Sequence, residues 1–424
     1  MFKTVKDAID WIESVKRFGD KLDLSRMEIA CELLNHPERN LNVIHIAGTN
    51  GKGSTVSYLK HILLEHGYHV GTFTSPYIVR FNERITYDYN DISDEELLVY
   101  INRVNSLYNK VLSTHHEVIT FFELITLISF MYFNDHPCDF VLYEVGLGGT
   151  LDATNVVMPL ITAITSISFD HMGVLGDTLE SIALNKLGIV KDNVPLVTAI
   201  DQEALFPVFE YHTAKHHSKL SYIDRDQIKN VSYGSHTKFN YKNNSYKLSM
   251  LGTHQVFNAC LALDVLFELQ EMKLITLEMN NVKLGLLKTY WPGRLEQFGN
   301  VYLDGAHNVG GATALKNSIQ EMFKGKHIKV LYATMADKEY FDVIGILDPV
   351  VDEIYFTEFD YPRCEKAIEA YHICSSVGAP THSQKFVADN AINTYKELKK
   401  ALQPNEILLV TGSLYFVSYM RKEL

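Results

Sequence analysis

The sequence has few cysteines and no cysteine pair. Its 424 residues contain five, at positions 31, 138, 260, 364 and 374, with no C-x-x-C spacing and no dense cluster. A disulfide framework is therefore not expected, and this usage is typical of free, mostly buried thiols in a reducing compartment. We expect a cytoplasmic protein.

The sequence also lacks an apolar run long enough to span a bilayer. The most apolar stretch, residues 121–133, contains Glu123 and is shorter than the about 20 residues that a spanning helix needs. The N-terminal stretch MFKTVKDAIDWIESVKRF has the pattern of an amphipathic helix, not of a signal peptide. We expect no membrane association.

Positive charge is scarce as well. Lys and Arg together number 39, against 51 Asp and Glu, which gives a formal net charge of −12. This balance excludes general binding to nucleic acids or to anionic membrane surfaces, so anionic substrates must be met by cations placed locally. With 46% hydrophobic and 21% charged residues, the composition is that of an ordinary globular protein, and the length predicts two or three domains.

The chain is organised around residues 43–58, VIHIAGTNGKGSTVSY. Residues 43–47 predict a buried parallel strand, and a helix is expected from about Ser54. That helix would carry an apolar face made by Val56, Leu59, Ile62 and Leu63. The turn between strand and helix consists of Gly48, Thr49, Asn50, Gly51, Lys52, Gly53 and Ser54.

This layout is typical of a phosphate-binding loop. Glycines let backbone N–H groups converge on phosphate oxygens, and the helix N-terminus adds its positive end. Lys52 would neutralise the outer phosphates, and Ser54 or Thr55 would offer a hydroxyl to Mg²⁺. The spacing G-x-x-G-K-G-S is two residues tighter than the common G-x-x-x-x-G-K-[ST]. The alternative is a glycine-rich strand–helix turn that holds no ligand.

Buried strands alternate with helices along most of the chain, which predicts an α/β protein with parallel sheets. In the first half, strands are expected at 43–47, 69–75, 139–145 and 160–168, helices at 24–34, 120–132 and 180–190 and from Ser93 onward, and an irregular charged loop at 80–87. Residues 195–250 indicate a small, mostly antiparallel appendage with a hairpin at Asn243-Asn244. Further strands are expected at 301–304, 328–334, 353–358 and 406–411. We therefore expect a P-loop-type ATPase domain over residues 1–292, including the appendage, and a Rossmann-like α/β domain over residues 293–424.

Polar residues follow the expected strands of the first domain. Ser75, Glu144 and His171 stand at such ends, as the glycine loop does, and ligands of parallel α/β sheets bind there. Glu144 is well placed to hold Mg²⁺, and the glycines that follow it favour this role over a surface carboxylate. For His171 a structural role remains equally open, because imidazole is an unusual Mg²⁺ ligand.

Other candidates are less distinctive when they are read locally. Lys186 has the surroundings of an exposed helix lysine, and Arg294 follows Gly293 at the expected domain junction, where it suits phosphate or carboxylate. Asp304 to His307 and Thr411 to Ser413 follow strands of the second domain. Both ends predict a second half-site that faces the first.

At these residues the chain resembles the folylpolyglutamate synthase / dihydrofolate synthase family, a branch of the Mur ligase superfamily. The matching pieces, which run from residue 45 to residue 417 in the family's order, are HIAGTNGKGSTV, TSP with RFNERI, EVGLGGTLDATN, FDHMGVLGDTLESIA, GTHQVFNA, WPGRLE, LDGAHN, MADKEY and VTGSLYFV. The resemblance implies a monomeric, ATP-dependent ligase. Such an enzyme phosphorylates a pterin-linked carboxylate or a glutamate γ-carboxylate of a folate, and the amine of L-glutamate then attacks the acyl phosphate to give an amide, ADP and phosphate.

The resemblance also implies roles for single residues. The glycine loop with Lys52 would hold the ATP phosphates, Asn258 the adenine and Asp304 the ribose, while Arg294 would contact phosphate. The implied metal ligands for two Mg²⁺ ions are Ser54, Ser75, Glu144, His171 and a carbamylated Lys186, and a monovalent cation is compatible with the family. His307 and Ser413 fall where the family binds the incoming glutamate. Lys52, Lys186, His171 and Arg294 are the residues expected to be catalytic.

The chain departs from the family pattern at four positions: Tyr77 replaces a common His, Thr150 an Arg, Asn185 a Glu and Val309 a Pro. None of these changes removes a phosphate or metal residue, but the first two concern the acceptor. Whether the acceptor is a folate, dihydropteroate or both therefore stays open. The competing interpretations are a ligase acting on another carboxylate, such as a cell-wall precursor, a catalytically silent homologue that binds nucleotide or folate, and a kinase or simple ATPase.

Overall fold

The computed structural model describes residues 1–16, 23–376, 378 and 381–424. By their contacts these form two compact units. The first unit comprises Met1–Ile167, His171–Asp224 and Asn258–Leu286, and the second comprises Ser168–Asp170, Arg225–Phe257 and Leu287–Leu424. The last segment of the second unit begins at Leu287, a few residues before the boundary expected at 292. The second unit also includes Arg225–Phe257, which contains the strands of the antiparallel appendage. Of the expected N-terminal helix, residues 17 and 18 lie outside the described residues.

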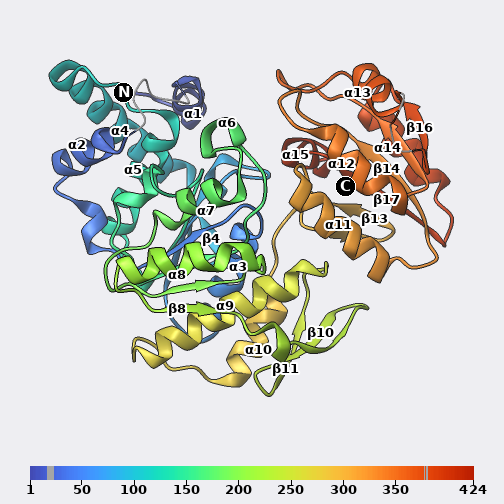
Figure 1. Ribbon diagram of the computed structural model, residues 1–424. Coiled ribbons are helices and arrows are strands. Elements are labelled where there is room, and N and C mark those ends of the chain that lie inside the picture. Colours follow the sequence, from blue (N-terminus) through green and yellow to red (C-terminus); the bar gives the residue numbers. More distant parts are fainter. Residues whose placement is uncertain (17–22, 377, 379–380) are drawn as a thin grey trace. The chain divides into compact units, whose positions relative to one another are not determined.

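The first unit contains an eight-stranded sheet in the order β4-β3-β2-β5-β1-β6-β7-β8 (Figure 1). Its strands are β1 (Val43–Ala47), β2 (Val70–Phe73), β3 (Ile85–Tyr87), β4 (Asn90–Asp91), β5 (Phe140–Glu144), β6 (Ile161–Ile164), β7 (Leu196–Thr198) and β8 (Leu220–Tyr222). The six strands from β2 to β8 in this order run parallel, and β3 and β4 extend the edge in antiparallel pairs. β1 lies between β5 and β6, so both of its neighbours exclude water from it and all five of its residues are buried.

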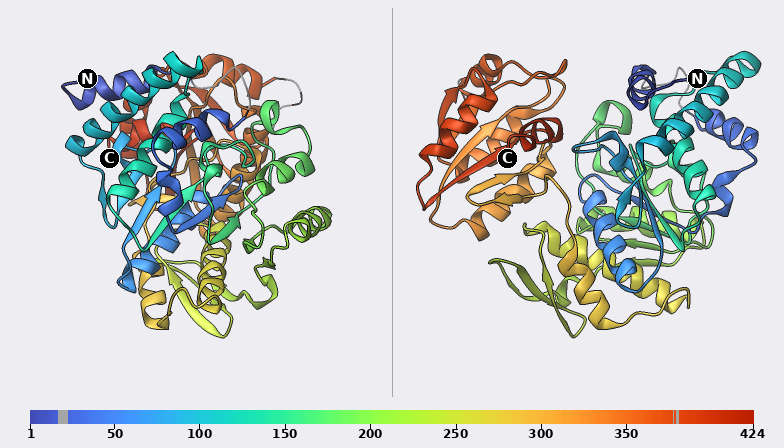
Figure 2. Two further views of the ribbon diagram at one scale, coloured as in Figure 1. Left: turned by 90° about the vertical axis from the view of Figure 1, so that its left-hand side faces the viewer. Right: turned by 180° about the vertical axis from the view of Figure 1, so that it is seen from behind.

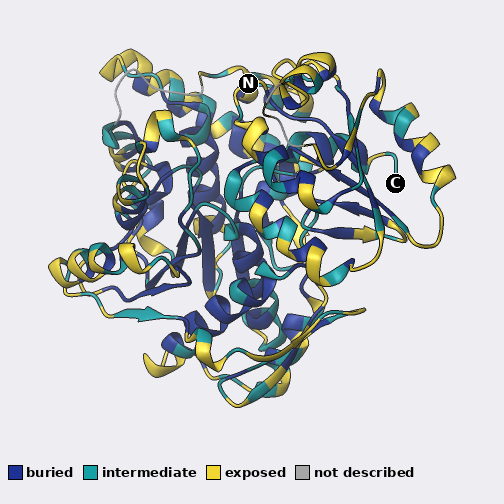
Figure 3. Ribbon diagram, turned by 45° about the vertical axis from the view of Figure 1, so that its right-hand side comes forward, coloured by how far each residue is buried: buried dark blue, intermediate teal, exposed yellow. Residues whose placement is uncertain are grey.

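Helices cover both faces of this sheet. They are α1 (Val5–Ser14), α2 (Ser25–Leu33), α3 (Lys52–Glu65), α4 (Asp94–His115), α5 (Phe121–Asp135), α6 (Met172–Leu175), α7 (Leu179–Leu187), α8 (Phe206–Lys215), α9 (His254–Glu271) and α10 (Met279–Lys288), with short 3₁₀ turns at Pro37–Asn40, Phe81–Arg84, Ala153–Val156 and Glu203–Leu205. A further 3₁₀ turn at Arg225–Gln227 belongs to the second unit. α1, α2, α4 and α5 share one apolar core with Phe73 and Tyr143 of the sheet. α3 packs on β1, β2 and β5 with residues outside that core. The expected apolar face of α3, made by Val56, Leu59, Ile62 and Leu63, is buried. Figure 3 shows buried residues along the central strands and exposed residues along the outer turns of the helices.

The second unit contains a six-stranded sheet in the order β12-β13-β17-β14-β15-β16. Its strands are β12 (Glu296–Phe298), β13 (Val301–Leu303), β14 (His327–Tyr332), β15 (Glu353–Phe356), β16 (Gln384–Val387) and β17 (Glu406–Thr411), and its helices are α11 (Val309–Met322), α12 (Tyr340–Leu347), α13 (Ala367–Cys374), α14 (Ala391–Ala401) and α15 (Leu414–Arg421), with a 3₁₀ turn at Asp348–Val350. Only β12 pairs antiparallel. Alternate residues of β14 point into two cores, one with α11 to α13 and one with α14 and α15, so helices lie on both faces (Figure 2).

The antiparallel appendage is smaller than the sequence suggested. Only β9 (Lys229–Ser232), β10 (Thr237–Tyr241) and β11 (Asn244–Leu248) form a separate antiparallel sheet. The hairpin turn has positive φ at Lys242 and Asn243, as an asparagine-rich hairpin predicts. The expectation that the appendage starts at residue 195 was wrong, because β7 and β8 continue the parallel sheet. Their three-residue length left no clear periodic signal.

One further expectation was wrong, and two strands were not expected at all. Residues 80–87 are not an irregular loop but a 3₁₀ turn followed by β3, whose pairing with β2 the short segment did not reveal. β12 and β16 were not predicted, and both are edge strands with exposed residues, which weakens the hydrophobic pattern.

The five cysteines are free, and Cys31, Cys260 and Cys374 are buried, as the sequence predicted. No helix in the described part of the chain combines the length and the apolar character that crossing a membrane requires.

Candidate active site

The turn between β1 and α3 needs glycine at two positions. Gly48 has a φ of +144° and Gly51 of +90°, a backbone region that residues with a Cβ rarely adopt. A Cβ at Gly48 would also collide with the Thr165 hydroxyl, and one at Gly51 with the side-chain amide of Asn258. The loop is therefore shaped by close contacts from β6 and α9 as well as by its own conformation.

α3 begins at Lys52, two residues earlier than expected, because the left-handed Gly51 serves as its N-cap. Ser54 and Thr55 consequently lie in the first turn, where both are buried. Within the described residues, the Thr55 hydroxyl oxygen has no hydrogen-bond partner. The helix start thus contains hydroxyl oxygens at the place where the sequence predicted a contact to Mg²⁺.

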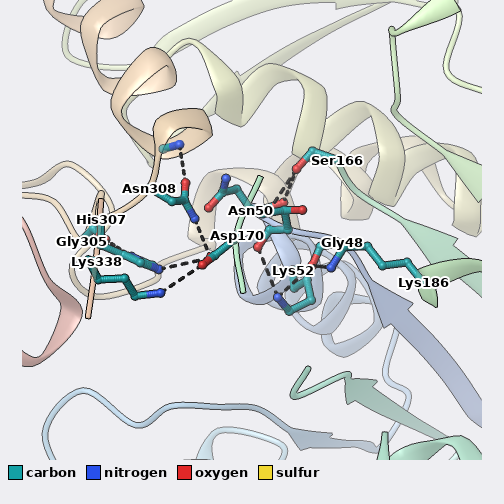
Figure 4. Close-up of polar contacts among 12 residues, drawn as sticks. Gly48, Asn50, Lys52, Ser166, Asp170, Lys186, Gly305, His307, Asn308 and Lys338 are labelled. Atoms are coloured by element: carbon teal, nitrogen blue, oxygen red, sulfur yellow. Dashed lines mark hydrogen bonds and ion pairs between the residues drawn. The ribbon is translucent and has the colours of Figure 1, made fainter. Parts of the chain in front are cut away.

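The segment that follows β6 is hydrogen-bonded to the glycine loop, residues 48–54 (Figure 4). Thr49 donates its backbone N–H to the carbonyl of Ser166 at 2.8 Å, and Asn50 donates its own to the Ser166 hydroxyl at 3.1 Å. The hydroxyls of Thr165 and Ser166 in turn donate to the Asn50 carbonyl at 2.6 and 3.0 Å. These bonds fix the backbone of the loop before any ligand arrives, which is preorganisation in the sense used for enzyme sites.

Two lysines meet at one carbonyl of the loop. Lys52 Nζ donates to the Gly48 carbonyl at 3.0 Å and to that of Thr49 at 3.3 Å. Lys186 Nζ donates to the same Gly48 carbonyl at 3.1 Å from α7 (Figure 4). The local interpretation of Lys186 as an exposed lysine was wrong, since the residue is 3% exposed. Two amino groups on a single acceptor, next to a helix N-terminus, make a site suited to an anion.

Glu144 and Ser75 lie together at the ends of β5 and β2. The Ser75 backbone N–H donates to Glu144 Oε2 at 3.2 Å, and Glu144 is 5% exposed. We expected Glu144 and His171 to follow neighbouring strands, and this was wrong, because β1 separates β5 from β6. His171 is an exposed residue with a φ of +53° that caps α6.

Two positions at which the chain departs from the family pattern touch one another. Thr150 donates both its backbone N–H and its hydroxyl to the backbone carbonyl of Asn185, each at 2.9 Å. Asn185 precedes Lys186 in α7. Tyr77, a third departure, donates from its hydroxyl to Glu13 of α1 at 3.2 Å and lies under the Arg84 guanidinium. These contacts hold Thr150 against the end of α7 that carries Lys186.

In the second unit, Asp304 follows β13 and is 6% exposed. Burial raises the pKa of the Asp304 carboxyl. The Arg294 charge and the backbone N–H groups of Ala306 and Leu295, which both donate to Asp304 at 2.9 Å, act in the opposite direction. His254 is partly buried, and this burial, followed by the Arg294 charge, lowers its pKa to about 4. Arg294 therefore stands beside a buried carboxylate and a neutral imidazole.

Ser413 follows β17, which pairs with β13, so Ser413 and Asp304 stand at neighbouring strand ends. Ser413 caps α15 by accepting the Tyr415 N–H and is 3% exposed. His307 follows Asp304 in the same loop, and its Nδ1 donates to the Gly305 carbonyl at 2.8 Å. This bond leaves Nε2 of His307 turned away from its own loop.

Asp170, for which the sequence predicted no role, lies close to three polar side chains of the second unit. Asp170 accepts from Lys338 Nζ at 3.0 Å and from Asn308 Nδ2 at 2.8 Å, and His307 Nε2 lies 3.7 Å from it (Figure 4). Asn308 also caps α11. The motifs FDHMG and MADKEY contain Asp170 and Lys338, but only their place in the motif could have marked them.

The Gly51 geometry gives a testable expectation. Gly51→Ala adds left-handed strain of about 1–3 kcal/mol and a collision with Asn258, so both the thermal midpoint and the affinity for ADP should fall. Gly67→Ala is the matched control, because Gly67 has a φ of +82° with open space around its Cβ position. Calorimetric titration with ADP should show weaker binding for the first variant only. Equal affinities in both would contradict the packing of Asn258 on the loop.

Comparisons with known proteins identify the family of this chain. The Mur ligase middle domain matches residues 46–266, and the Mur ligase glutamate ligase domain matches residues 293–414. A dihydrofolate synthase/folylpolyglutamate synthase of Bacillus subtilis is 39% identical over the whole of both chains, and the dihydrofolate synthetase of Saccharomyces cerevisiae is 33% identical, with 80% of this chain and 82% of the yeast protein covered.

Solved structures agree as well. The folylpolyglutamate synthase of Mycobacterium tuberculosis in complex with ADP has a TM-score of 0.88 at 26% identity, with 99% of this chain and 98% of that chain covered. The Thermotoga maritima enzyme has a TM-score of 0.84 at 29% identity, with 99% and 96% covered. The match therefore covers the residues of both units. The chain belongs to the folylpolyglutamate synthase / dihydrofolate synthase family of the Mur ligases.

Proposed function

We propose that this protein is an ATP-dependent ligase that adds L-glutamate to a folate, to dihydropteroate or to both. The observation that carries the proposal is the pair of lysines, Lys52 and Lys186, that meets at the Gly48 carbonyl in a chain of this family. The acceptor carboxylate attacks the γ-phosphorus of ATP and releases ADP. The glutamate amine then attacks the acyl phosphate, loses a proton and expels phosphate, which leaves an amide.

The glycine loop would hold the β- and γ-phosphates through the N–H groups of residues 49–55. Lys52 reaches over the loop, so it can exchange its carbonyl partners for phosphate oxygens of higher charge. Asn258, which packs on Gly51, would contact the base. Arg294 and Asp304 of the second unit would contact phosphate and ribose.

The donors present fit Mg²⁺, which prefers oxygen. Glu144, Ser75 and Ser54 supply oxygens, while His171 and Lys186 complete the proposed set. No three His, Cys, Asp or Glu side chains converge anywhere in the described ranges, so nucleotide and water would supply the remaining ligands. When bound, Mg²⁺ neutralises charge on the transferring phosphoryl group. A second Mg²⁺ and a monovalent cation are part of the same proposal.

We further propose that Lys186 is carbamylated. A neutral amine takes up CO₂ and loses one proton, which gives a group with carboxylate character. Lys186 is buried beside Lys52 Nζ, and both burial and a neighbouring cation favour a neutral amine. His307 and Ser413 would bind the incoming glutamate, although Ser413 is buried as an N-cap.

The metal assignment predicts a shift in Mg²⁺ dependence. Glu144→Ala removes a buried oxygen ligand, so half-maximal activity should need at least about tenfold more Mg²⁺. The measurement is ADP release during a Mg²⁺ titration at saturating ATP. Glu95→Ala, which changes an exposed acid of α4, should leave the curve unchanged. An unaltered curve for Glu144→Ala would remove this residue from the metal site.

The acceptor is tested by incubating the protein with Mg-ATP and glutamate, and with either dihydropteroate or tetrahydrofolate. ADP release that depends on one acceptor identifies it, and release with both shows a bifunctional enzyme. Product mass should increase by one glutamyl residue for each ADP released. Release with neither acceptor, together with measurable ADP binding, would overturn the proposal in favour of a silent homologue.

A further inference from the structure

His45 is a buried titratable residue that the proposed ligation does not use. It lies in the middle of β1, the strand that enters the glycine loop, and its side chain is fully buried. Burial, followed by the charge of Lys191, lowers the pKa of His45 to about 3, so the ring is neutral at pH 7. Its Nε2 atom lies 2.8 Å from the hydroxyl of Thr154, which is also fully buried.

The direction of this hydrogen bond follows from the next partner. The Thr154 hydroxyl donates its only hydrogen to Asp152 Oδ1 at 2.5 Å. Asp152 also accepts the backbone N–H of Thr154 at 3.0 Å and that of Leu147 at 2.8 Å, as an ionised carboxylate does. The Thr154 oxygen must therefore accept from His45, which places the imidazole hydrogen on Nε2. Among the described residues, Nδ1 of this ring has no partner.

Asp152 closes the loop that follows Glu144. Glu144 is the last residue of β5, and residues 145–152 form this loop. The Asp152 carboxylate accepts the N–H of Leu147, and the Asp152 backbone N–H donates to the Gly149 carbonyl at 3.2 Å. Asp152 therefore fixes the loop at two points. Because Thr154 and His45 hold the carboxylate, β1 determines where this loop lies.

The same loop supports the end of α7 that carries Lys186. A Cβ at Gly149 would come within 2.7 Å of the Lys186 carbonyl oxygen, so the two backbones are in close contact. Thr150 donates twice to the carbonyl of Asn185. Lys186 Nζ in turn reaches the Gly48 carbonyl of the glycine loop (Figure 4). A shift of residues 145–152 would therefore move Lys186 relative to the glycine loop.

We propose that His45, Thr154 and Asp152 are positioning residues for phosphoryl transfer. They hold the loop of residues 145–152, so that Glu144 and Lys186 keep their places around the ATP phosphates. This inference rests on the proposed function. All three side chains belong to residues that are at most 5% exposed, which suits a role in orientation. Groups that orient metal ligands through hydrogen bonds typically contribute about ten- to a hundredfold to metal affinity or activity.

Removal of one hydroxyl tests this chain of hydrogen bonds. Thr154→Val should lower kcat for ADP release by about tenfold or more and raise the Mg²⁺ concentration needed for half-maximal activity. The KM for ATP should change little, because the glycine loop keeps its bonds to Thr165 and Ser166. Thr154→Ser retains the hydroxyl and should restore kcat, which a loss of packing alone does not predict.

Thr162→Val is the matched control. Thr162 is the neighbour of His45 in β6, is equally buried, and donates its hydroxyl to the Pro195 carbonyl at 3.0 Å. Its loss should lower the thermal midpoint without a change in kcat or in Mg²⁺ dependence. Equal kcat values for Thr154→Val and Thr162→Val, measured well below both midpoints, would overturn the positioning role.

Two substitutions of His45 test which ring nitrogen matters. His45→Gln places an amide N–H near the position of Nε2, so it can still donate to Thr154, whereas the shorter side chain of His45→Asn reaches only the position of Nδ1. We expect His45→Gln to keep most of the wild-type kcat and His45→Asn to lose it. The opposite order would contradict the assigned direction of the bonds. If neither variant folds, the two Thr154 variants still decide the question.

Two further measurements need no acceptor. ¹⁵N spectra of the wild type with labelled histidine should show His45, identified by the signal that its variants lack, with hydrogen on Nε2 at pH 7. Hydrogen on Nδ1 would reverse the chain and overturn the inference. Calorimetry should show that Mg²⁺ strengthens ADP binding less in Thr154→Val than in the wild type, and an equal gain would refute the positioning role. A wild type that binds Mg-ADP but ligates neither acceptor would refute the proposed function alone.

Discussion

Lys52→Ala should lower kcat/KM for ligation by at least about a hundredfold, because it removes a charge contact to the phosphoryl group in the transition state. Among the residues that the structure describes, Lys52 donates only to the Gly48 and Thr49 carbonyls of its own loop, at 3.0 and 3.3 Å, so no distant element there loses a partner. The expected cost in stability is therefore small, about 1 kcal/mol. Initial rates of ADP release with the accepted folate or pteroate acceptor measure the effect.

Lys110→Ala provides the control, because Lys110 is an exposed lysine on α4 of the same unit. Both variants should have wild-type circular dichroism and similar thermal midpoints. Only Lys52→Ala should lose turnover. A Lys52→Ala enzyme with near wild-type turnover would show that the loop does not hold the transferred phosphate through this residue.

Lys186→Ala should be nearly inactive, with the loss mainly in kcat. If the carbamate is part of the site, its removal leaves the γ-phosphate poorly neutralised during transfer, which affects the transition state more than substrate binding. Short carboxylic acids such as acetate should partly restore activity by entering the space left by the side chain. The rescue should depend on the acid and not on chloride at equal ionic strength.

Lys60→Ala is a matched control for this experiment. Lys60 is another largely buried lysine of the first unit, with a pKa lowered by burial to about 8, and it donates to Thr86 at 2.8 Å. Its loss should reduce stability without creating an acid-dependent activity. Crystals of the wild type with ATP should show extra density on Lys186 Nζ. An unmodified amine there, together with a fully active Lys186→Ala variant, would refute the carbamate.

The parts of the fold that could be predicted were those with a strong local signal. β1 is a continuous apolar run that ends in glycines, and Ser93 with Glu96 forms a capping box at the start of α4. β7 and β8 have three residues each, so a parallel continuation of the sheet could not be distinguished from a loop. Their place follows from pairing with β6, which is information from distant residues.

Some residues of the candidate site also have a strong local signal in the sequence, and others have none. Lys52 could be predicted because its neighbours in sequence are also its neighbours in space. Lys186 could not be predicted from local pattern, since its partner Gly48 is 138 positions away, and only the family resemblance marked it. The grouping of Asp170 with Lys338 likewise joins residues 168 positions apart. Contacts of this kind form only in the folded protein, so the hydrophobic periodicity of the sequence does not predict them.

The burial of the native thiols has a practical consequence for chemical labelling. Burial raises the pKa of Cys138 and of Cys374 to about 12, and it raises the pKa of Cys31 and of Cys364 as well. At pH 8 a thiol with a pKa of about 12 is thiolate in about one molecule in ten thousand, and the thiolate is the species that maleimides attack. A cysteine introduced at an exposed position would thus react far faster than Cys138 or Cys374. Fluorophores could be attached to each unit without first removing the native cysteines.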